Sequence, residues 1–165
     1  MKSLLISFLW IMISATACGE NEEDTTEADI SAPETEVNGS AAISNVTVIG
    51  EENRYTFNVT IKSPDLGCNQ YADWWEVLTE DGDTLIYRRI LAHSHVDEQP
   101  FTRSGGAVKI TKDQIVYVRA HMNTNGYGTV VYKGNVTDGF NQDTVATEFG
   151  VALETMEPLP SGCAF

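Results

Sequence analysis

Residues 55–62 read Tyr-Thr-Phe-Asn-Val-Thr-Ile-Lys, and this stretch decides the fold class. Its large apolar side chains, Tyr55, Phe57, Val59 and Ile61, alternate with polar ones. Successive side chains of a β-strand point to opposite faces of the sheet. The alternation therefore predicts a strand with one buried face and one face in water.

The same period of two continues on both sides of this stretch. The apolar runs 74–79 and 84–90 flank Glu80-Asp81-Gly82-Asp83, and Asp-Gly between such runs predicts a hairpin. Further strands are expected at residues 43–49, 107–111, 115–121, 129–133 and 144–153. The pattern predicts one all-β domain over residues 41–165, a β-sandwich of roughly seven or eight strands, with a small barrel as the alternative.

Part of this region resembles a known family. Trp74 and Trp75 open a central strand, and Val116-x-Val118-x-Ala120 precedes Asn123-x-x-Gly126-x-Gly128. In this order residues 41–136 resemble a fibronectin type III or immunoglobulin-like domain, although Val116 stands where the family has a tyrosine. The resemblance implies a fold and not a chemistry.

The first 18 residues resemble the start of a bacterial lipoprotein. Lys2 precedes an apolar stretch, residues 4–13, that is too short to span a bilayer of about 30 Å. Ala15-Thr16-Ala17-Cys18 is similar to a lipobox, with Ala15 where leucine is preferred. The resemblance implies that residues 1–17 are a signal peptide, cleaved off before Cys18 receives lipid.

The cysteine count agrees with this interpretation. The chain has three cysteines, and an exported protein does not normally leave an odd one. If Cys18 is lipidated, Cys68 and Cys163 remain as a pair. We expect them to form a disulfide in an oxidising compartment, with two buried thiols as the alternative.

Residues 18–40 are expected to form a disordered acidic tether. After Cys18 this segment has eight acidic residues, no basic one and no aromatic one, so it cannot bury enough apolar surface to fold. Its start, Cys18-Gly19-Glu20-Asn21-Glu22-Glu23-Asp24, resembles the export signal of Bacteroidota lipoproteins. That resemblance implies an outer-membrane anchor, with the domain facing the cell surface.

The charge of the chain restricts its partners. The formal net charge is −14, and residues 41–165 hold 16 acidic and 9 basic residues. This excess of negative charge argues against nucleic acids and anionic lipid head groups as partners of the domain.

The three histidines suggest one possible metal site. On a strand, His93 and His95 would share a face, and His121 from a neighbouring strand could supply a third imidazole. The carboxylate of Glu98 or Asp97 could replace His121 as the third ligand. Zinc or copper would be the expected ion. The alternative is that the histidines form hydrogen bonds within a long connection.

Two further groups of residues could bind a ligand. His95, Glu98 and Arg103 could line a polar patch. Trp74 and Trp75 must point to opposite faces of a strand, so only one can enter the core. The other either is covered by the segment after residue 134 or the loop at Cys68, or forms an exposed platform with Tyr71, Tyr87 or Tyr127.

We therefore expect a lipid-anchored extracytoplasmic binding module with a glycan or an envelope or surface protein as partner. A metal-binding or metal-dependent enzyme domain with a three-histidine site is the alternative, and a purely structural envelope protein is a third hypothesis. No motif for a nucleophile or an oxyanion site is evident, so catalysis is the less favoured hypothesis.

Overall fold

The computed structural model describes residues 39–164, which lie within one compact unit. The predicted signal peptide and Cys18 lie outside the described range, as does the predicted tether up to residue 38. The strands are β1 Ala42–Ile49, β2 Tyr55–Lys62, β3 Ala72–Thr79, β4 Leu85–Ile90, β5 Phe101–Val108, β6 Val116–Met122, β7 Gly126–Tyr127, β8 Val130–Asn135 and β9 Gly139–Thr144. A short 3-10 helix, η1 Val151–Thr155, follows them.

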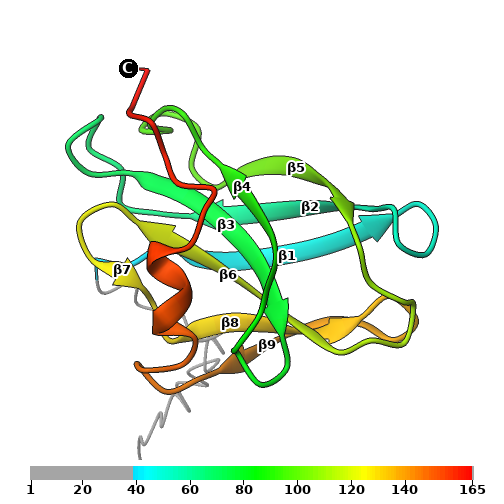
Figure 1. The fold of residues 1–165 in the computed structure, drawn as a ribbon. Coiled ribbons are helices and arrows are strands. Elements are labelled where there is room, and N and C mark those ends of the chain that lie inside the picture. The colour runs from blue at the N-terminus through cyan, green and yellow to red at the C-terminus, as the bar shows by residue number, and fades with distance from the viewer. Residues whose placement is uncertain (1–38, 165) are drawn as a thin grey trace, which may run out of the picture. The chain divides into compact units, whose positions relative to one another are not determined.

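The strands form two antiparallel sheets packed as a β-sandwich, which confirms the predicted fold class (Figure 1). One sheet has the order β1-β2-β5. The other has the order β4-β3-β6-β8-β9, and the short β7 pairs with β6. Within the described residues, no helix is long and apolar enough to span a membrane.

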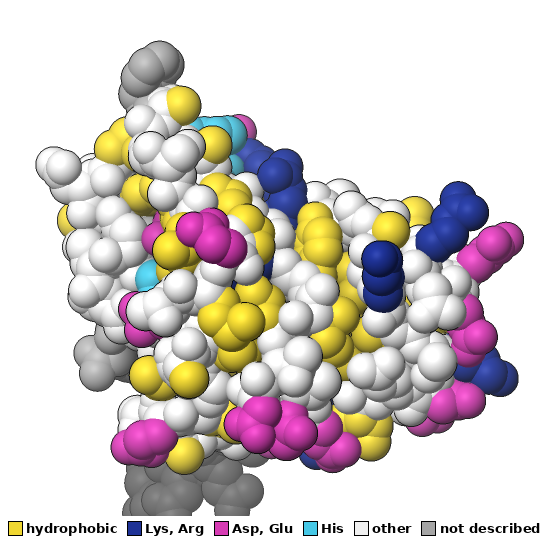
Figure 2. Space-filling view, viewed as in Figure 1, with side chains coloured by type: hydrophobic (Ala, Val, Ile, Leu, Met, Phe, Trp, Pro, Cys, Tyr) yellow, Lys and Arg dark blue, Asp and Glu magenta, His cyan; other side chains and the backbone are white. Residues whose placement is uncertain are grey.

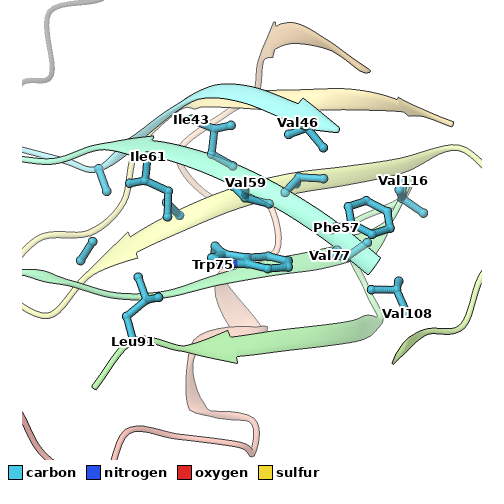
Figure 3. Close-up of a cluster of buried hydrophobic side chains, with 14 of the residues drawn as sticks. Ile43, Val46, Phe57, Val59, Ile61, Trp75, Val77, Leu91, Val108 and Val116 are labelled. Atoms are coloured by element: carbon cyan, nitrogen blue, oxygen red, sulfur yellow. The ribbon is translucent and has the colours of Figure 1, made fainter. Parts of the chain in front are cut away.

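The core lies between the sheets and follows the predicted alternation (Figure 3). Phe57, Val59 and Ile61 of β2 are fully buried, whereas Thr56, Asn58 and Thr60 lie on the partly exposed outer face of their sheet. Trp75 of β3 is also fully buried and packs against this cluster. A period of two along β2 was therefore sufficient to identify the inner face of the smaller sheet.

Two predicted strands differ from the structure. Residues 107–111 were expected as a strand, but β5 begins earlier, at Phe101, because its pairing with β2 overrides the polar and glycine-rich sequence Thr-Arg-Ser-Gly-Gly. Residues 144–153 were also expected as a strand. That prediction is wrong: the edge strand β9 ends at Thr144, and Gly150, with a φ of 62°, leads into η1.

A third layer covers the outer face of the larger sheet. The segment after β9 passes in front of β3 and β6, with η1 at its centre (Figure 1). Leu153 of η1 packs with Leu78, Tyr117 and Val131 in a second apolar cluster. Figure 2, in the same view, shows hydrophobic side chains over the middle of this face and acidic ones along its lower edge.

A disulfide joins the end of this layer to the sandwich. Cys68, in the β2–β3 connection, is bonded to Cys163, as the cysteine count predicted. The two residues are 95 positions apart, so the bond closes most of the domain into one loop. Nearby, the amide of Ala164 donates to the carbonyl of Ala92 in the β4–β5 connection.

Candidate functional site

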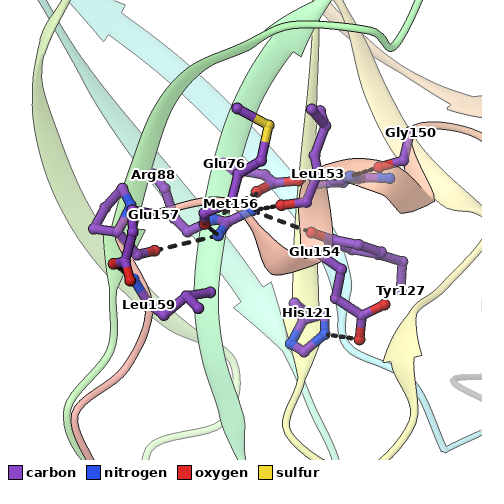
Figure 4. Close-up of polar contacts among 12 residues, drawn as sticks. Glu76, Arg88, His121, Tyr127, Gly150, Leu153, Glu154, Met156, Glu157 and Leu159 are labelled. Atoms are coloured by element: carbon purple, nitrogen blue, oxygen red, sulfur yellow. Dashed lines mark hydrogen bonds and ion pairs between the residues drawn. The ribbon is translucent and has the colours of Figure 1, made fainter.

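Three buried charges lie on the outer face of the larger sheet. Both carboxylate oxygens of Glu76 are used. Oε2 accepts from Nε of Arg88 at 2.7 Å (Figure 4). Oε1 accepts from Nε of Arg119 at 2.8 Å. Each guanidinium also places its Nη2 within 2.7 Å of the same oxygen. We call these three residues the Arg-Glu-Arg cluster.

Sheet register builds this cluster. Glu76 is at the middle of β3, and its neighbours in the ladder are Arg88 on β4 and Arg119 on β6. Residues opposite each other in antiparallel strands present their side chains to the same face, so the carboxylate lies between the two cations. All three side chains are at most 2% exposed, so the charges are held almost without water.

The remaining donors of the two arginines point to main-chain carbonyls of the segment after β9, residues 145–164, which we call the C-terminal layer. Arg119 donates to the carbonyls of Phe149 at 2.6 Å and Gly150 at 2.9 Å. Arg88 donates to the carbonyls of Leu153, Met156 and Pro158. The two guanidiniums therefore hold five carbonyls of one continuous segment, and buried charges with this many partners avoid most of the cost of desolvation.

Both tryptophans of β3 are buried, on opposite faces as predicted. Trp75 lies in the core, and Trp74 lies on the outer face with only 3% of its surface exposed. The guanidinium of Arg88 lies 4.5 Å from the Trp74 ring, and Tyr127 meets that ring edge-on. The hypothesis of an exposed aromatic platform formed by Trp74 or Trp75 with Tyr127 is therefore wrong for this structure, because other side chains cover both indoles.

His121 belongs to this same outer face. Its ring stacks on Trp74, its Nδ1 lies 2.6 Å from a carboxylate oxygen of Asp73, and its Nε2 lies 3.1 Å from Glu154 of η1. Asp73 is buried, whereas the side chain of Glu154 is 42% exposed. His121 thus connects β3 to the C-terminal layer.

His95 lies in the β4–β5 connection and not on a strand. The side chain of Asp65 fixes this connection, because its carboxylate accepts from the main-chain amides of His95 at 2.8 Å and Ala72 at 3.0 Å. The His95 ring stacks on Phe101 at 3.7 Å and is 2% exposed. Burial, and then the positive charge of Arg103, lower the pKa of His95 to about 4.

Neither ring nitrogen of His95 has a hydrogen-bond partner among the residues that the structure describes. The nearest carboxylate oxygen, on Asp65, is 3.9 Å from Nδ1, which is too far for a hydrogen bond. The lowered pKa keeps this imidazole neutral at neutral pH. A buried imidazole without hydrogen-bond partners destabilises the folded state. The stack on Phe101 and the bond from the His95 amide to Asp65 offset this cost and hold the β4–β5 connection in place.

A surface pocket of about 340 Å³ lies over the same connection. It is lined by Gly67, His93, Ser94, His95, Val96, Asp97 and Glu98. Two exposed aliphatic side chains lie at or next to a lining residue in the sequence: Leu66, in the β2–β3 connection, is 74% exposed, and Val96, in the β4–β5 connection, is 49% exposed. The volume is near the lower limit for small-molecule sites, so the pocket could hold a group the size of one sugar ring.

Of the predicted polar patch, two residues meet directly. Arg103 donates to Glu98 at 2.8 Å, and this bond lowers the pKa of the Glu98 carboxyl. Glu98 lines the pocket with His95, whereas the guanidinium of Arg103 lies over the ring of Phe101. The patch of His95, Glu98 and Arg103 is thus one neighbourhood, although the His95 nitrogens are covered.

The structure does not bring the three histidines together. His93 and His95 are neighbours, with ring centroids 4.5 Å apart, but His121 is held by Asp73, Glu154 and Trp74. Within residues 39–164, no group of three or more His, Cys, Asp or Glu side chains is placed to hold a metal ion. The metal-site alternative required His93 and His95 to converge with His121, or with Glu98 or Asp97. This convergence is absent from the described residues, and β6 directs His121 to the outer face of the sheet.

The Arg-Glu-Arg cluster is the feature that sequence reasoning missed. A signal was present: Glu76 and Arg119 each lie between two apolar residues of a strand, and Arg88 follows three apolar residues of β4. A charge within such a run must find an opposite charge when it is buried.

Comparison with known proteins identifies one informative relative. A protein from the archaeon Halomicrobium mukohataei, named "Putative lipoprotein", is 40% identical to this chain over 116 residues. The match covers 70% of this chain and 52% of the relative, so the chain spans about half the length of that protein. No family model matches the chain. No solved structure matches it either.

Proposed function

We propose that this chain is the precursor of a lipoprotein that displays a β-sandwich outside the cytoplasm. The disulfide between Cys68 and Cys163 carries the proposal, because it uses two of the three cysteines and leaves Cys18 for lipid. The name of the archaeal relative agrees with this role. Labelling with a palmitate analogue, in the wild type and in Cys18→Ser, tests the anchor.

The proposed division of the chain follows from its sequence. Residues 1–17 are the signal peptide, residues 18–40 the tether and residues 41–165 the displayed domain. The acid-rich start of the tether supports transport to the outer membrane and its surface, as in Bacteroidota lipoproteins. Protease treatment of intact cells tests this placement: a surface-exposed domain is degraded, whereas a domain behind the outer membrane is protected until the membrane is permeabilised.

The strand order supports a fibronectin type III-like architecture. In immunoglobulin constant domains the fourth strand joins the sheet of the first, second and fifth strands. Here β4 pairs with β3, in the sheet that also contains β6 and β8. Fibronectin type III domains place their fourth strand in the same way, and such domains mostly serve as spacers or binding modules.

The pocket over the β4–β5 connection is the proposed binding site of this module. Its lining combines the exposed imidazole of His93 with the carboxylates of Asp97 and Glu98, which suit the hydroxyl groups of a sugar. Val96 lines the pocket, and the exposed Leu66 is next to the lining residue Gly67, so these aliphatic side chains suit the apolar face of the same ring. A glycan of the cell envelope is therefore the favoured ligand, and an envelope or surface protein is the second candidate.

A glycan array tests this role. We expect the purified wild-type domain to bind a defined saccharide, and His93→Ala and Glu98→Gln to lose that binding. Glu51→Gln is the matched control, because Glu51 is exposed in the β1–β2 turn at the other end of the strands. Equal binding by Glu98→Gln and Glu51→Gln would exclude the pocket, and a wild type that binds no saccharide would favour a protein partner or a purely structural role.

A further inference from the structure

The C-terminal strap, which we define as residues 149–164, is held in two different ways. Its first part is packed: Leu153 is 2% exposed within an apolar cluster, and Arg119 holds the carbonyls of Phe149 and Gly150. Its second part, residues 156–164, is mostly exposed. Arg88, the Cys163 disulfide and the amide of Ala164 provide its contacts to the sandwich.

Arg88 recognises the main chain of this second part and not its side chains. Its Nη1 donates to the carbonyls of Met156 and Pro158, two positions apart (Figure 4). The side chains of Met156 and Leu159 remain 46% and 39% exposed. Because it uses only main-chain carbonyls, this contact is not specific to the strap's own side chains.

The residues of the strap that contact Arg88 indicate what kind of peptide the site could bind. Residues 156–160 read Met-Glu-Pro-Leu-Pro, and Met156 has the extended angles φ −84° and ψ 141°. Prolines lack a main-chain donor, so such a segment offers carbonyls without needing acceptors in return. Arginine, which has donors only, complements it.

The charged Arg-Glu-Arg cluster is better suited to a segment that can detach than to one that is bound permanently. A permanent cover would be held at least as well by apolar packing, because buried ion pairs are weak stabilisers compared with apolar residues of similar volume. An apolar surface, however, would be costly to uncover in water. Charged side chains become hydrated when exposed, which lowers the cost of removing residues 156–164. After that removal Trp74 keeps its contacts with His121 and Tyr127.

We propose that Arg88 is the centre of a binding site for proline-containing peptides, which residues 156–164 fill while the Cys68–Cys163 disulfide is intact. A dithiol reductant opens the site. It transfers two electrons and two protons to the disulfide, giving the thiols of Cys68 and Cys163, and is itself oxidised to a disulfide. Residues 156–164 then leave, and Nη1 of Arg88 becomes free for the carbonyls of a partner.

Hydrogen exchange on the intact chain tests the opening step. After reduction we expect the amide of Ala164, which donates to the carbonyl of Ala92, to lose protection, while those of β3, β6 and Leu153 keep theirs. The double variant Cys68→Ser/Cys163→Ser should behave like the reduced wild type. Unchanged protection of the Ala164 amide would overturn the proposal, and so would a loss of protection across β3 and β6, which would mean that reduction unfolds the domain.

Peptide binding tests the site itself. The probe is a fluorescent heptapeptide with the sequence of residues 156–162, titrated to several millimolar because a tethered strap competes at an effective concentration of about millimolar. We expect saturable binding to the reduced protein and to the double serine variant, and none to the oxidised protein. Arg88→Gln, made in the double serine variant, should weaken binding at least tenfold.

Arg89→Gln in the same background is the matched control. Arg89 is next in sequence but donates to the carbonyls of Ser104 and Ile90, away from the strap. Equal binding by the Arg88 and Arg89 variants would overturn the site, as would equal binding by the oxidised and reduced proteins or no binding to a protein whose strap has opened.

Discussion

Trp74 lies flat against His121, with ring centroids 3.6 Å apart and planes inclined by only 7°. The stack joins β3 to β6 on the face opposite the core. It places a large aromatic side chain beneath the C-terminal layer, in contact with Arg88. The outer face of the larger sheet is thus a second packed interior.

This packing predicts that the two adjacent tryptophans are both essential for stability. Trp74→Ala and Trp75→Ala should each lower the free energy of unfolding by about 3–5 kcal/mol, because each removes a large buried ring. Chemical denaturation followed by circular dichroism measures the loss. A Trp74→Ala variant as stable as the wild type would show that the C-terminal layer does not cover this side chain in solution.

The Arg-Glu-Arg cluster should depend on its carboxylate. Glu76→Gln keeps the shape of the side chain but leaves two buried guanidiniums without their counter-charge, so we expect a loss of about 3–5 kcal/mol. Glu157→Gln, on the exposed surface of the strap, is the control and should change the free energy of unfolding little. Similar losses for the two variants would argue against a cluster held by Glu76.

The disulfide should stabilise the domain strongly. For a loop closed across 95 positions, the loss of chain entropy in the unfolded state corresponds to about 4–5 kcal/mol. Cys68→Ser/Cys163→Ser should therefore unfold at markedly lower denaturant concentration than the oxidised wild type and close to the reduced wild type. Two titratable thiols in the unreduced, denatured domain would contradict the bond directly.

His95 should make stability depend on pH. Its pKa is lowered to about 4 in the folded state, whereas an unfolded chain has a histidine pKa of about 6.5. The full stability is present above pH 6.5. As the pH falls towards 4, the unfolded chain takes up a proton that the folded chain resists, and up to about 3 kcal/mol is lost.

His95→Phe tests this directly, because phenylalanine can keep the stack on Phe101 without a titratable group. The variant should lose less stability than the wild type between pH 7 and pH 4, as measured by guanidinium denaturation at each pH. Parallel pH profiles for the two proteins would assign the acid sensitivity to other groups.

Local patterns in the sequence predicted the parts of the structure that depend on neighbouring residues. Alternation identified β2 and its buried residues, Asp-Gly identified the β3–β4 hairpin, and cysteine parity identified the disulfide. Features set by register between distant strands were not predictable in this way. Whether Arg88 and Arg119 flank Glu76, and whether His121 reaches His93, depends on which strands pair and on which face each residue lies.

The same distinction explains the wrong prediction for the C-terminal region. Residues 144–153 contain apolar side chains at strand-like spacing, but their partner is the outer face of the larger sheet and not a strand edge. Leu153 is buried there by Leu78 and Tyr117, which are far away in sequence. A local pattern cannot distinguish these two ways of burying apolar surface.

The central claim, that this β-sandwich is carried by a lipidated Cys18, is tested most directly by labelling with a palmitate analogue in a host that processes lipoproteins. The wild type should incorporate label, and Cys18→Ser should incorporate none and accumulate as the unprocessed precursor. Cys68→Ser/Cys163→Ser should be labelled like the wild type, because these residues form the disulfide. Equal labelling of the wild type and Cys18→Ser would contradict the account.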